Sequence, residues 1–213
     1  MFGRVVTRSL ALQLLLVSYC AAQAIDPGPV RVGDRWSYDS KDALTGDLRQ
    51  AVTIVAAEIS QKEITTRVSV RGKDRFQTVI FDLDWGRIDD DLWKYRPSDL
   101  LGIKKPLQIG KQWRTEGNAT NLKSGDAFQA SGIGKVAAQE QVTTSAGTFD
   151  TFLVELTVRL VNTLDQTKST TLNVVTWYAP AINRWVKKKT EVRADGRLRD
   201  SNLEELTEFA RRP

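Results

Sequence analysis

The sequence contains no histidine, and its single cysteine, Cys20, lies close to the N-terminus. Without histidine or a second cysteine, the chain cannot form a Ser-His-Asp or Cys-His nucleophile system. It also lacks the nitrogen and sulfur ligands of the usual zinc, copper and haem sites. An enzyme of this composition would need carboxylates or a Ser-Lys pair, and a bound cation would need oxygen ligands. We therefore expect no cofactor, no metal and no enzymatic activity.

The chain also lacks an apolar run long enough to cross a membrane as a helix. Its most apolar stretch, Ser9–Val17, follows two arginines and precedes the small-residue sequence Ala22-Gln23-Ala24. These are the three parts of a secretory signal peptide, so we predict cleavage after Ala24 and a periplasmic or secreted protein that does not span a membrane. The alternatives are an uncleaved anchor and a lipid-modified Cys20. Against the latter, Tyr19 stands where a lipoprotein signal requires a small residue.

Strong charge of one sign is absent as well. The chain carries 31 basic and 26 acidic residues, and loss of Arg4 and Arg8 with the leader leaves 29 basic ones. This small excess is interspersed along the chain, which argues against a nucleic-acid partner. The one basic cluster, Lys187–Lys189, is typical of an exposed edge strand, where lysines prevent pairing with another chain.

No helical periodicity of ordinary length is found after the leader, whereas alternation of apolar and polar residues is frequent. The clearest example is Thr151–Leu160, in which every second residue from Phe152 is apolar. The polar run Asn162–Ser169 predicts a turn, and the β-branched and aromatic residues after it predict a returning strand. We expect an all-β protein: a single curved antiparallel sheet or half-barrel of roughly ten strands. Residues 25–213 are expected to form one domain after the signal peptide of residues 1–24.

Two short similarities suggest an internal duplication. Gly33 and Gly110 each follow an aliphatic residue and precede a tryptophan by three positions, and Val55–Glu58 resembles Val136–Gln139. The similarities lie about eighty residues apart, which predicts degenerate halves over 30–108 and 109–213. The alternative is that a Gly-x-x-Trp pattern recurs by chance in a β protein.

Tryptophan is plentiful and provides the first candidate site. Aromatic and aliphatic side chains on one face of a sheet can line a groove for an apolar ligand. The residues we predict to bind such a ligand are Trp36, Trp113, Leu156, Trp177 and Tyr178. The alternative for the tryptophans is that they cap the core at strand ends.

The acidic run from Asp82 to Asp91 is the second candidate, as an oxygen-ligand calcium site. It departs from the EF-hand pattern because Gly86 occupies the fifth position of the loop, where the sixth is required. We therefore favour the alternative that these carboxylates are solvated.

Several segments together resemble a known group of proteins. These are the Gly-x-x-Trp segment around Trp36, the AGTF turn of Ala146–Phe149, and the Trp-Tyr-Ala-Pro turn of Trp177–Pro180 before a Val-Lys pair. They are similar to bacterial exported β proteins of unknown function, the TapB-like and related families, over most of residues 31–209. Asn183-Arg184-Trp185 stands where that pattern usually has a glycine. The layout is also similar to the half-barrels of periplasmic lipoprotein carriers. The resemblance implies no catalytic residues.

Three functions remain open at this point. The first is a periplasmic binding module for an apolar ligand or an envelope partner. The second is a structural or assembly protein of the cell envelope without a small ligand, and the third is a carboxylate-based hydrolase. One sheet face must be packed as core, be covered by the connection Arg96–Gly110, or stay available to a ligand. An open face lined by apolar residues favours the first function, a filled face the second, and converging carboxyl groups the third.

Overall fold

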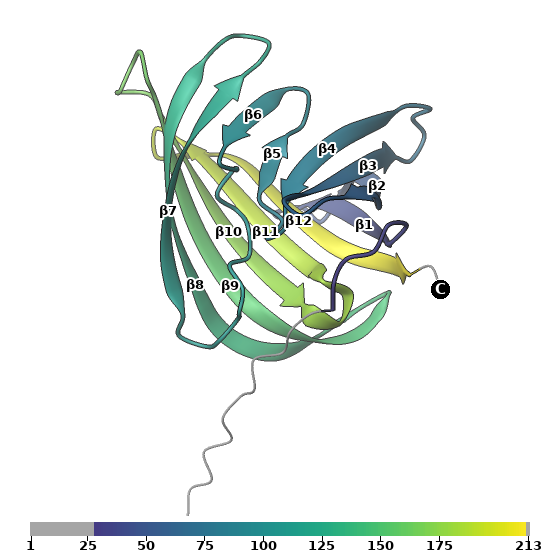
Figure 1. Ribbon diagram of the computed structural model, residues 1–213. Coiled ribbons are helices and arrows are strands. Elements are labelled where there is room, and N and C mark those ends of the chain that lie inside the picture. Colours follow the sequence, from purple (N-terminus) through teal and green to yellow (C-terminus); the bar gives the residue numbers. More distant parts are fainter. Residues whose placement is uncertain (1–27, 212–213) are drawn as a thin grey trace, which may run out of the picture.

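A computed structural model of the chain describes residues 28–211, which form twelve antiparallel strands and one short 3₁₀ helix (Figure 1). The predicted signal peptide and Cys20 lie outside the described residues. The strands are β1 (Arg35–Asp42), β2 (Leu48–Ile59), β3 (Glu63–Val70), β4 (Phe76–Asp82), β5 (Arg87–Asp89), β6 (Trp93–Arg96), β7 (Gln112–Asn121), β8 (Ala127–Thr144), β9 (Gly147–Asn162), β10 (Ser169–Ala179), β11 (Arg184–Ala194) and β12 (Arg197–Ala210), with helix η1 (Pro180–Ile182) between β10 and β11. No helix within 28–211 is long and apolar enough to cross a membrane.

The strands form a closed barrel in which each strand pairs with its neighbours in sequence and β1 pairs with β12. The all-β antiparallel prediction is confirmed, but the prediction of an open sheet or half-barrel of roughly ten strands is wrong. Closure depends on a pairing that joins Arg35 to Ala210, the two ends of the fold. The short strands β5 and β6 complete the wall between β4 and β7. Closure through β1 and β12 has no local sequence signal, because pairing between distant segments is not encoded in periodicity.

The hairpins are formed by polar side chains that bind their own backbone. In the β1–β2 turn, the Asp42 carboxylate accepts hydrogen bonds from the backbone N–H groups of Leu44 and Thr45, at 2.8 and 3.1 Å. Asn121 makes the same two bonds in the β7–β8 turn, and Asn162 makes them in the β9–β10 turn. These Asx turns fix the strand ends because the side chain replaces a backbone partner.

The barrel core consists of the inward-facing residues of the long strands. In β9, Phe152, Val154, Leu156 and Val158 are buried, as the alternation predicted. The residues of β10 that pair with them, Val174 and Tyr178 among them, face the same core. Successive side chains of a strand point to opposite faces, so the intervening residues form the outer surface.

The connection between β6 and β7, residues 97–111, runs across the strands in the view of Figure 1 and contributes side chains to the barrel core. Its side chains Leu100, Ile103 and Leu107 are almost fully buried. Leu100 packs against Ala130 of β8 and Val158 of β9. The segment is held by its backbone, since the Ile103 N–H donates to the carbonyl of Asp84 at 2.6 Å. We call residues 97–111 the plug.

One local prediction is also corrected. Lys187–Lys189 do not lie on an edge strand, because β11 pairs with β10 on one side and β12 on the other. At the C-terminal end, Leu203, Leu206 and Phe209 lie in strand β12, whose residues Asn202–Ala210 pair with β1.

Candidate functional site

The part of the barrel interior that the plug does not fill holds a cavity of about 830 Å³. Its walls come from β1–β4 and β10–β12, and the plug contributes Leu101 and Ile103. Exposed lining residues, including Gln50 and Lys73, lie where the β1–β2 and β3–β4 hairpins end. Buried ones lie toward the opposite end of the barrel. The cavity therefore has an open mouth and a closed floor.

Four aromatic residues make up the floor, and we call them the aromatic floor: Tyr38, Phe81, Trp85 and Trp185. Phe81 and Trp85 pack edge to face, with ring centroids 5.4 Å apart. Trp85 follows β4 with a left-handed backbone (φ 67°), and its indole Nε1 donates to the carbonyl of Asn183 at 2.6 Å. The Tyr38 hydroxyl donates to the carbonyl of Trp185 at 2.9 Å. Tyr38 and Trp85 are therefore each fixed by a hydrogen bond at the polar end of the ring.

Arg184, the first residue of β11, lies among these rings with 0 % of its surface exposed. The centre of its guanidinium is 4.0 Å from the ring centroids of both Trp85 and Trp185. It is also 5.1 Å from that of Trp36 and 5.5 Å from that of Phe81. These are cation–π distances, and such contacts strengthen when the cation is removed from water.

No guanidinium nitrogen of Arg184 forms a hydrogen bond of standard geometry with any residue in 28–211. The indole nitrogen of Trp185 is likewise buried and unpartnered within that range. Buried polar atoms almost always have partners, so several unsatisfied donors in one place require an explanation. Arg184 also forms no ion pair with a described carboxylate. It interacts with the Tyr38 hydroxyl both electrostatically and through a hydrogen bond outside that standard geometry.

Burial changes the acid–base properties of both groups. Loss of hydration lowers the pKa of Arg184, an effect that the nearby Tyr38 and Glu204 partly oppose. Burial likewise raises the pKa of the Tyr38 phenol, against the influence of the Arg184 charge. Arg184 forms no ion pair with a described residue, so the burial of its charge is opposed only by these nearby groups and by the aromatic rings.

Two further charged residues face the cavity above the floor. Lys188 of β11 and Glu204 of β12 are directly opposite each other in the antiparallel register. The Lys188 ammonium lies 4.6 Å from the ring centroid of Trp185. Among the described residues, neither Lys188 nor Glu204 forms an ion pair within 4.0 Å. Their neighbours Lys187 and Glu205 point outward and pair with each other at 3.5 Å.

Acidic residues on another part of the wall are fully engaged. Asp90 and Asp99 both bind Arg87 of β5, at 2.6 and 3.4 Å. Asp99 also accepts hydrogen bonds from the backbone N–H groups of Arg87 and Leu101. Asp90 accepts two more from the turn before β6. These carboxylates therefore tie the plug to the β4–β6 region.

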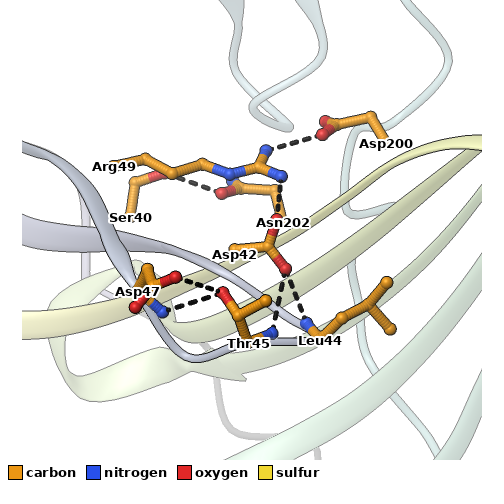
Figure 2. A network of polar contacts seen from close by, with 8 residues as sticks. All are labelled: Ser40, Asp42, Leu44, Thr45, Asp47, Arg49, Asp200 and Asn202. Carbon is orange, nitrogen blue, oxygen red and sulfur yellow. Dashed lines mark hydrogen bonds and ion pairs between the residues drawn. The ribbon is translucent and has the colours of Figure 1, made fainter.

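The mouth is bordered by the network drawn in Figure 2. Arg49 of β2 bridges two carboxylates, donating to Asp42 at 2.5 Å and to Asp200 at 2.6 Å. Below it, the Ser40 hydroxyl donates to the side-chain oxygen of Asn202 at 2.7 Å. Arg49 thereby links the β1–β2 hairpin to β12 across the rim. Its bonds, together with those from Leu44 and Thr45, lower the pKa of Asp42 to about 2.

The five residues predicted to bind an apolar ligand do not form one site, and this cavity is lined by others. Trp36, Leu156 and Tyr178 are buried in the core. Trp113, at the start of β7, packs across Gly134 of β8. Trp177 lies on the outer face, where its indole donates to Glu140 at 2.5 Å. Their role in binding stays a prediction.

The acidic run does not gather its carboxylates. Asp82 accepts hydrogen bonds from the backbone N–H groups of Asp84 and Gly86, and Asp84 pairs with Lys104 of the plug at 3.0 Å. Burial raises the pKa of Asp82. Across residues 28–211 no group of three or more His, Cys, Asp or Glu is placed to hold a metal ion.

Sequence reasoning missed the residues that distinguish this cavity, chiefly Arg184, Lys188 and Glu204. One signal for Arg184 was available. A charged residue stands between the apolar residues Ile182 and Trp185, at a position where the resembling families usually have a glycine. Strand alternation also places Lys188 on the face opposite Lys187 and Lys189.

Comparisons with known proteins place this geometry in a wider group. No protein-family model matches the sequence, and a search of curated proteins finds no match. Among solved structures, a candidate lipoprotein from Parabacteroides distasonis is similar with a TM-score of 0.57 and 13% identity, covering 85% of this chain and 97% of that one. A candidate exported protein with a YmcC-like fold from Bacteroides fragilis is similar with a TM-score of 0.54 and 13% identity, covering 86% and 98%.

At these identities the likeness concerns the fold alone, and the finer resemblance to TapB-like families stays a prediction. The barrel of this chain is thus similar in fold, over most of its length, to structures of exported bacterial proteins that include one with a YmcC-like fold.

Proposed function

We propose that the protein is a non-enzymatic binding module of the bacterial periplasm, and that it holds an amphipathic small ligand in the barrel cavity. The observation that carries this proposal is the cavity itself, about 830 Å³ in volume with an open mouth and an aromatic floor. Small-molecule sites are concave, mainly apolar and of about 300–1,000 Å³, with a few polar groups that orient the ligand.

The lining supports an amphipathic ligand rather than a wholly apolar one. Aliphatic residues of β2, β3 and β4, including Ile54, Val68 and Val79, form one wall. Polar and charged residues of β11 and β12 form the wall across the cavity, among them Lys188, Thr190 and Asn202. An apolar group would gain about 25 cal/mol for each Å² removed from water.

An enzymatic function has less support. The carboxylates Asp90 and Asp99 converge at the wall, but both are ion-paired with Arg87 and hydrogen-bonded to backbone N–H groups. A catalytic acid or base must be able to exchange its proton with a substrate. Paired in this way, the two groups serve to fix the plug.

A second candidate function is a structural protein of the envelope without a small ligand. The observation that favours it is the plug, which fills the barrel interior over β8 and β9 with Leu100 and Ile103. The same observation limits this candidate, since the plug lines the cavity between β1–β4 and β10–β12 with Leu101 and Ile103 but does not fill it.

The experiment is titration of the purified protein with N-phenyl-1-naphthylamine, a neutral apolar dye that fluoresces when it leaves water. We expect saturable binding by the native protein. Val68→Phe, which adds volume to the cavity wall, should weaken binding at least fivefold. Val55→Phe adds the same group to the outer face of β2 and should leave binding unchanged. Absence of saturable binding, or equal weakening by both variants, would reject a lumen site.

A further inference from the structure

The charges near the cavity floor do not cancel. Ion pairs engage the cations Arg49 and Arg87 with four carboxylates at the wall and mouth. Of the lining residues without an ion pair to a described residue, Lys73 is exposed at the mouth, whereas Arg184, Lys188 and Glu204 lie toward the floor. Two cations and one carboxylate therefore leave one positive charge in excess near the floor, where a low dielectric makes each charge act strongly.

The unsatisfied hydrogen-bonding groups at the floor point to the same kind of ligand. The guanidinium of Arg184 and the indole of Trp185 can only donate, and their buried nitrogens form no hydrogen bond of standard geometry with any described residue. Arg184 also lacks an ion pair within residues 28–211, and its ring contacts offset the burial of its charge only in part. These donors favour a ligand group with negative charge and acceptor oxygens.

We propose that the cavity binds its ligand through one acidic oxygen group, a carboxylate or a phosphate, held between Lys188 and Arg184, with the ligand's apolar body against Ile54, Val68 and Val79. This inference rests on the proposed function and adds the chemical class of the ligand. Lys188 is half-buried and faces the cavity above the floor, beyond the exposed Lys73 at the mouth. Arg184 lies behind it, among the aromatic rings.

The geometry also assigns a role to Glu204. It stands opposite Lys188 in the register and acts on the charge of Arg184. Its carboxylate is the acidic group directly opposite Lys188 in the pairing of β11 with β12. The nitrogens of Arg184 are screened from solvent, so entry of an acidic group requires a side-chain shift of Trp185 or Lys188, a common change on binding. Glu204 is a positioning residue in this scheme, whereas Lys188 and Arg184 contact the ligand.

The test compares two probes that differ only in charge: 11-(dansylamino)undecanoic acid and its methyl ester. We expect the native protein to bind the acid at least tenfold more tightly than the ester, because a charge-assisted bond is lost with esterification. Lys188→Met should weaken the acid about tenfold and leave the ester unchanged. Lys187→Met is the matched control, since it removes the same charge one residue away on the outer face. It should change neither probe.

A second pair of variants guards against misfolding. Lys188→Arg keeps the charge and should restore most of the affinity for the acid, and Arg184→Gln should reduce the preference for acid over ester. Competition with dodecyl phosphate, decanoate and inorganic phosphate separates the sources of the acidic group. Displacement by dodecyl phosphate alone assigns a phosphate, and displacement by decanoate assigns a carboxylate. If inorganic phosphate displaces the probe and neither dodecyl phosphate nor decanoate does, the apolar part of the proposal is rejected.

The outcomes distinguish failure of the proposed function from failure of the acidic-group inference. If neither probe binds, the proposed function fails and the inference with it. If acid and ester bind equally, and Lys188→Met affects them no more than Lys187→Met does, the cavity is a binding site but the acidic group is excluded.

Discussion

Trp85 and Asn183 occupy corresponding turns of the barrel and are bonded to each other. Each has a left-handed backbone, with φ of 67° and 49°, and each stands just before a strand, β5 and β11 respectively. The indole Nε1 of Trp85 donates to the carbonyl of Asn183 at 2.6 Å. Arg184 follows Asn183 directly, so this bond fixes the ring that covers its guanidinium.

Substitution Trp85→Phe should lower the free energy of unfolding by about 2 kcal/mol, because the buried carbonyl of Asn183 loses its donor. Urea unfolding followed by circular dichroism measures the change. Trp93→Phe is the control. Trp93 is half-buried and has no hydrogen bond from its indole to a described residue, so its loss should cost less than half as much. Equal costs would show that ring volume, not the hydrogen bond, decides.

Closure of the barrel depends in part on an ion pair between its two ends. Asp34 is 0 % exposed and receives two bonds from Arg211, at 3.0 and 2.9 Å. We expect Arg211→Met to lower stability by about 2 kcal/mol, because it leaves a buried carboxylate with only a backbone donor. In a double-mutant cycle with Asp34→Asn, the two changes should be strongly non-additive. Simple additivity would mean that the pair contributes nothing to closure.

The packing of Trp113 on β8 predicts an intolerance at one glycine. A Cβ atom at Gly134 would lie 2.4 Å from Cζ2 of the Trp113 indole and still closer to its Cε2. Gly134→Ala must therefore displace the ring, and overpacking of this kind costs about 1–3 kcal/mol. Ser131→Ala, at an exposed outward position of the same strand, should stay within about 0.5 kcal/mol of the native protein. Thermal unfolding of both variants gives the comparison.

The network at the cavity mouth predicts that the stability of the protein falls at acidic pH. The folded-state pKa of Asp42, about 2, is lower than its ordinary value near 3.8. The unfolded chain therefore binds the proton first as pH falls, so the contribution of Asp42 is complete above pH 4 and is lost between about pH 4 and 2. Asp42→Asn keeps the turn, as Asn121 does in the β7–β8 hairpin, but cannot titrate. The melting temperature of the Asp42→Asn variant should fall less steeply than that of the native protein between pH 4 and 2. Parallel curves would contradict the assignment.

The sequence indicated the strands well and their assembly poorly. The alternation from Phe152 to Val158 and the Asx-forming turns are local features, and both are present in the structure. Closure through β1 and β12, and the inward course of the plug, are contacts between distant segments. No periodicity within either partner records them.

The candidate site was harder still. A strand pattern shows which residues share a face but not where a cavity remains after the core has packed, so the predicted aromatic set falls partly in the core and partly outside. Arg184 illustrates the difficulty, because its significance lies in having no partner. That property can be seen only once its surroundings have been placed.

The duplication stays a prediction, now with specific residues to superpose. Gly33 and Gly110 both have a left-handed backbone and donate to β2 and β8 respectively. Bulges interrupt β2 after Ala56 and β8 after Val136. Six strands follow from each start within residues 28–211. If the two sets cannot be superposed in the same order, these similarities are coincidental.

The lead-in before β1 leaves the barrel on the side away from the cavity mouth. The carbonyl of Gly28 accepts a hydrogen bond from the Asn183 side chain at 2.9 Å, directly behind the aromatic floor. The exposed lining residues Gln50 and Lys73 lie at the other end of the barrel. The first described residue therefore lies behind the closed end of the barrel. A ligand that enters by the mouth, at the other end, does not cross this lead-in.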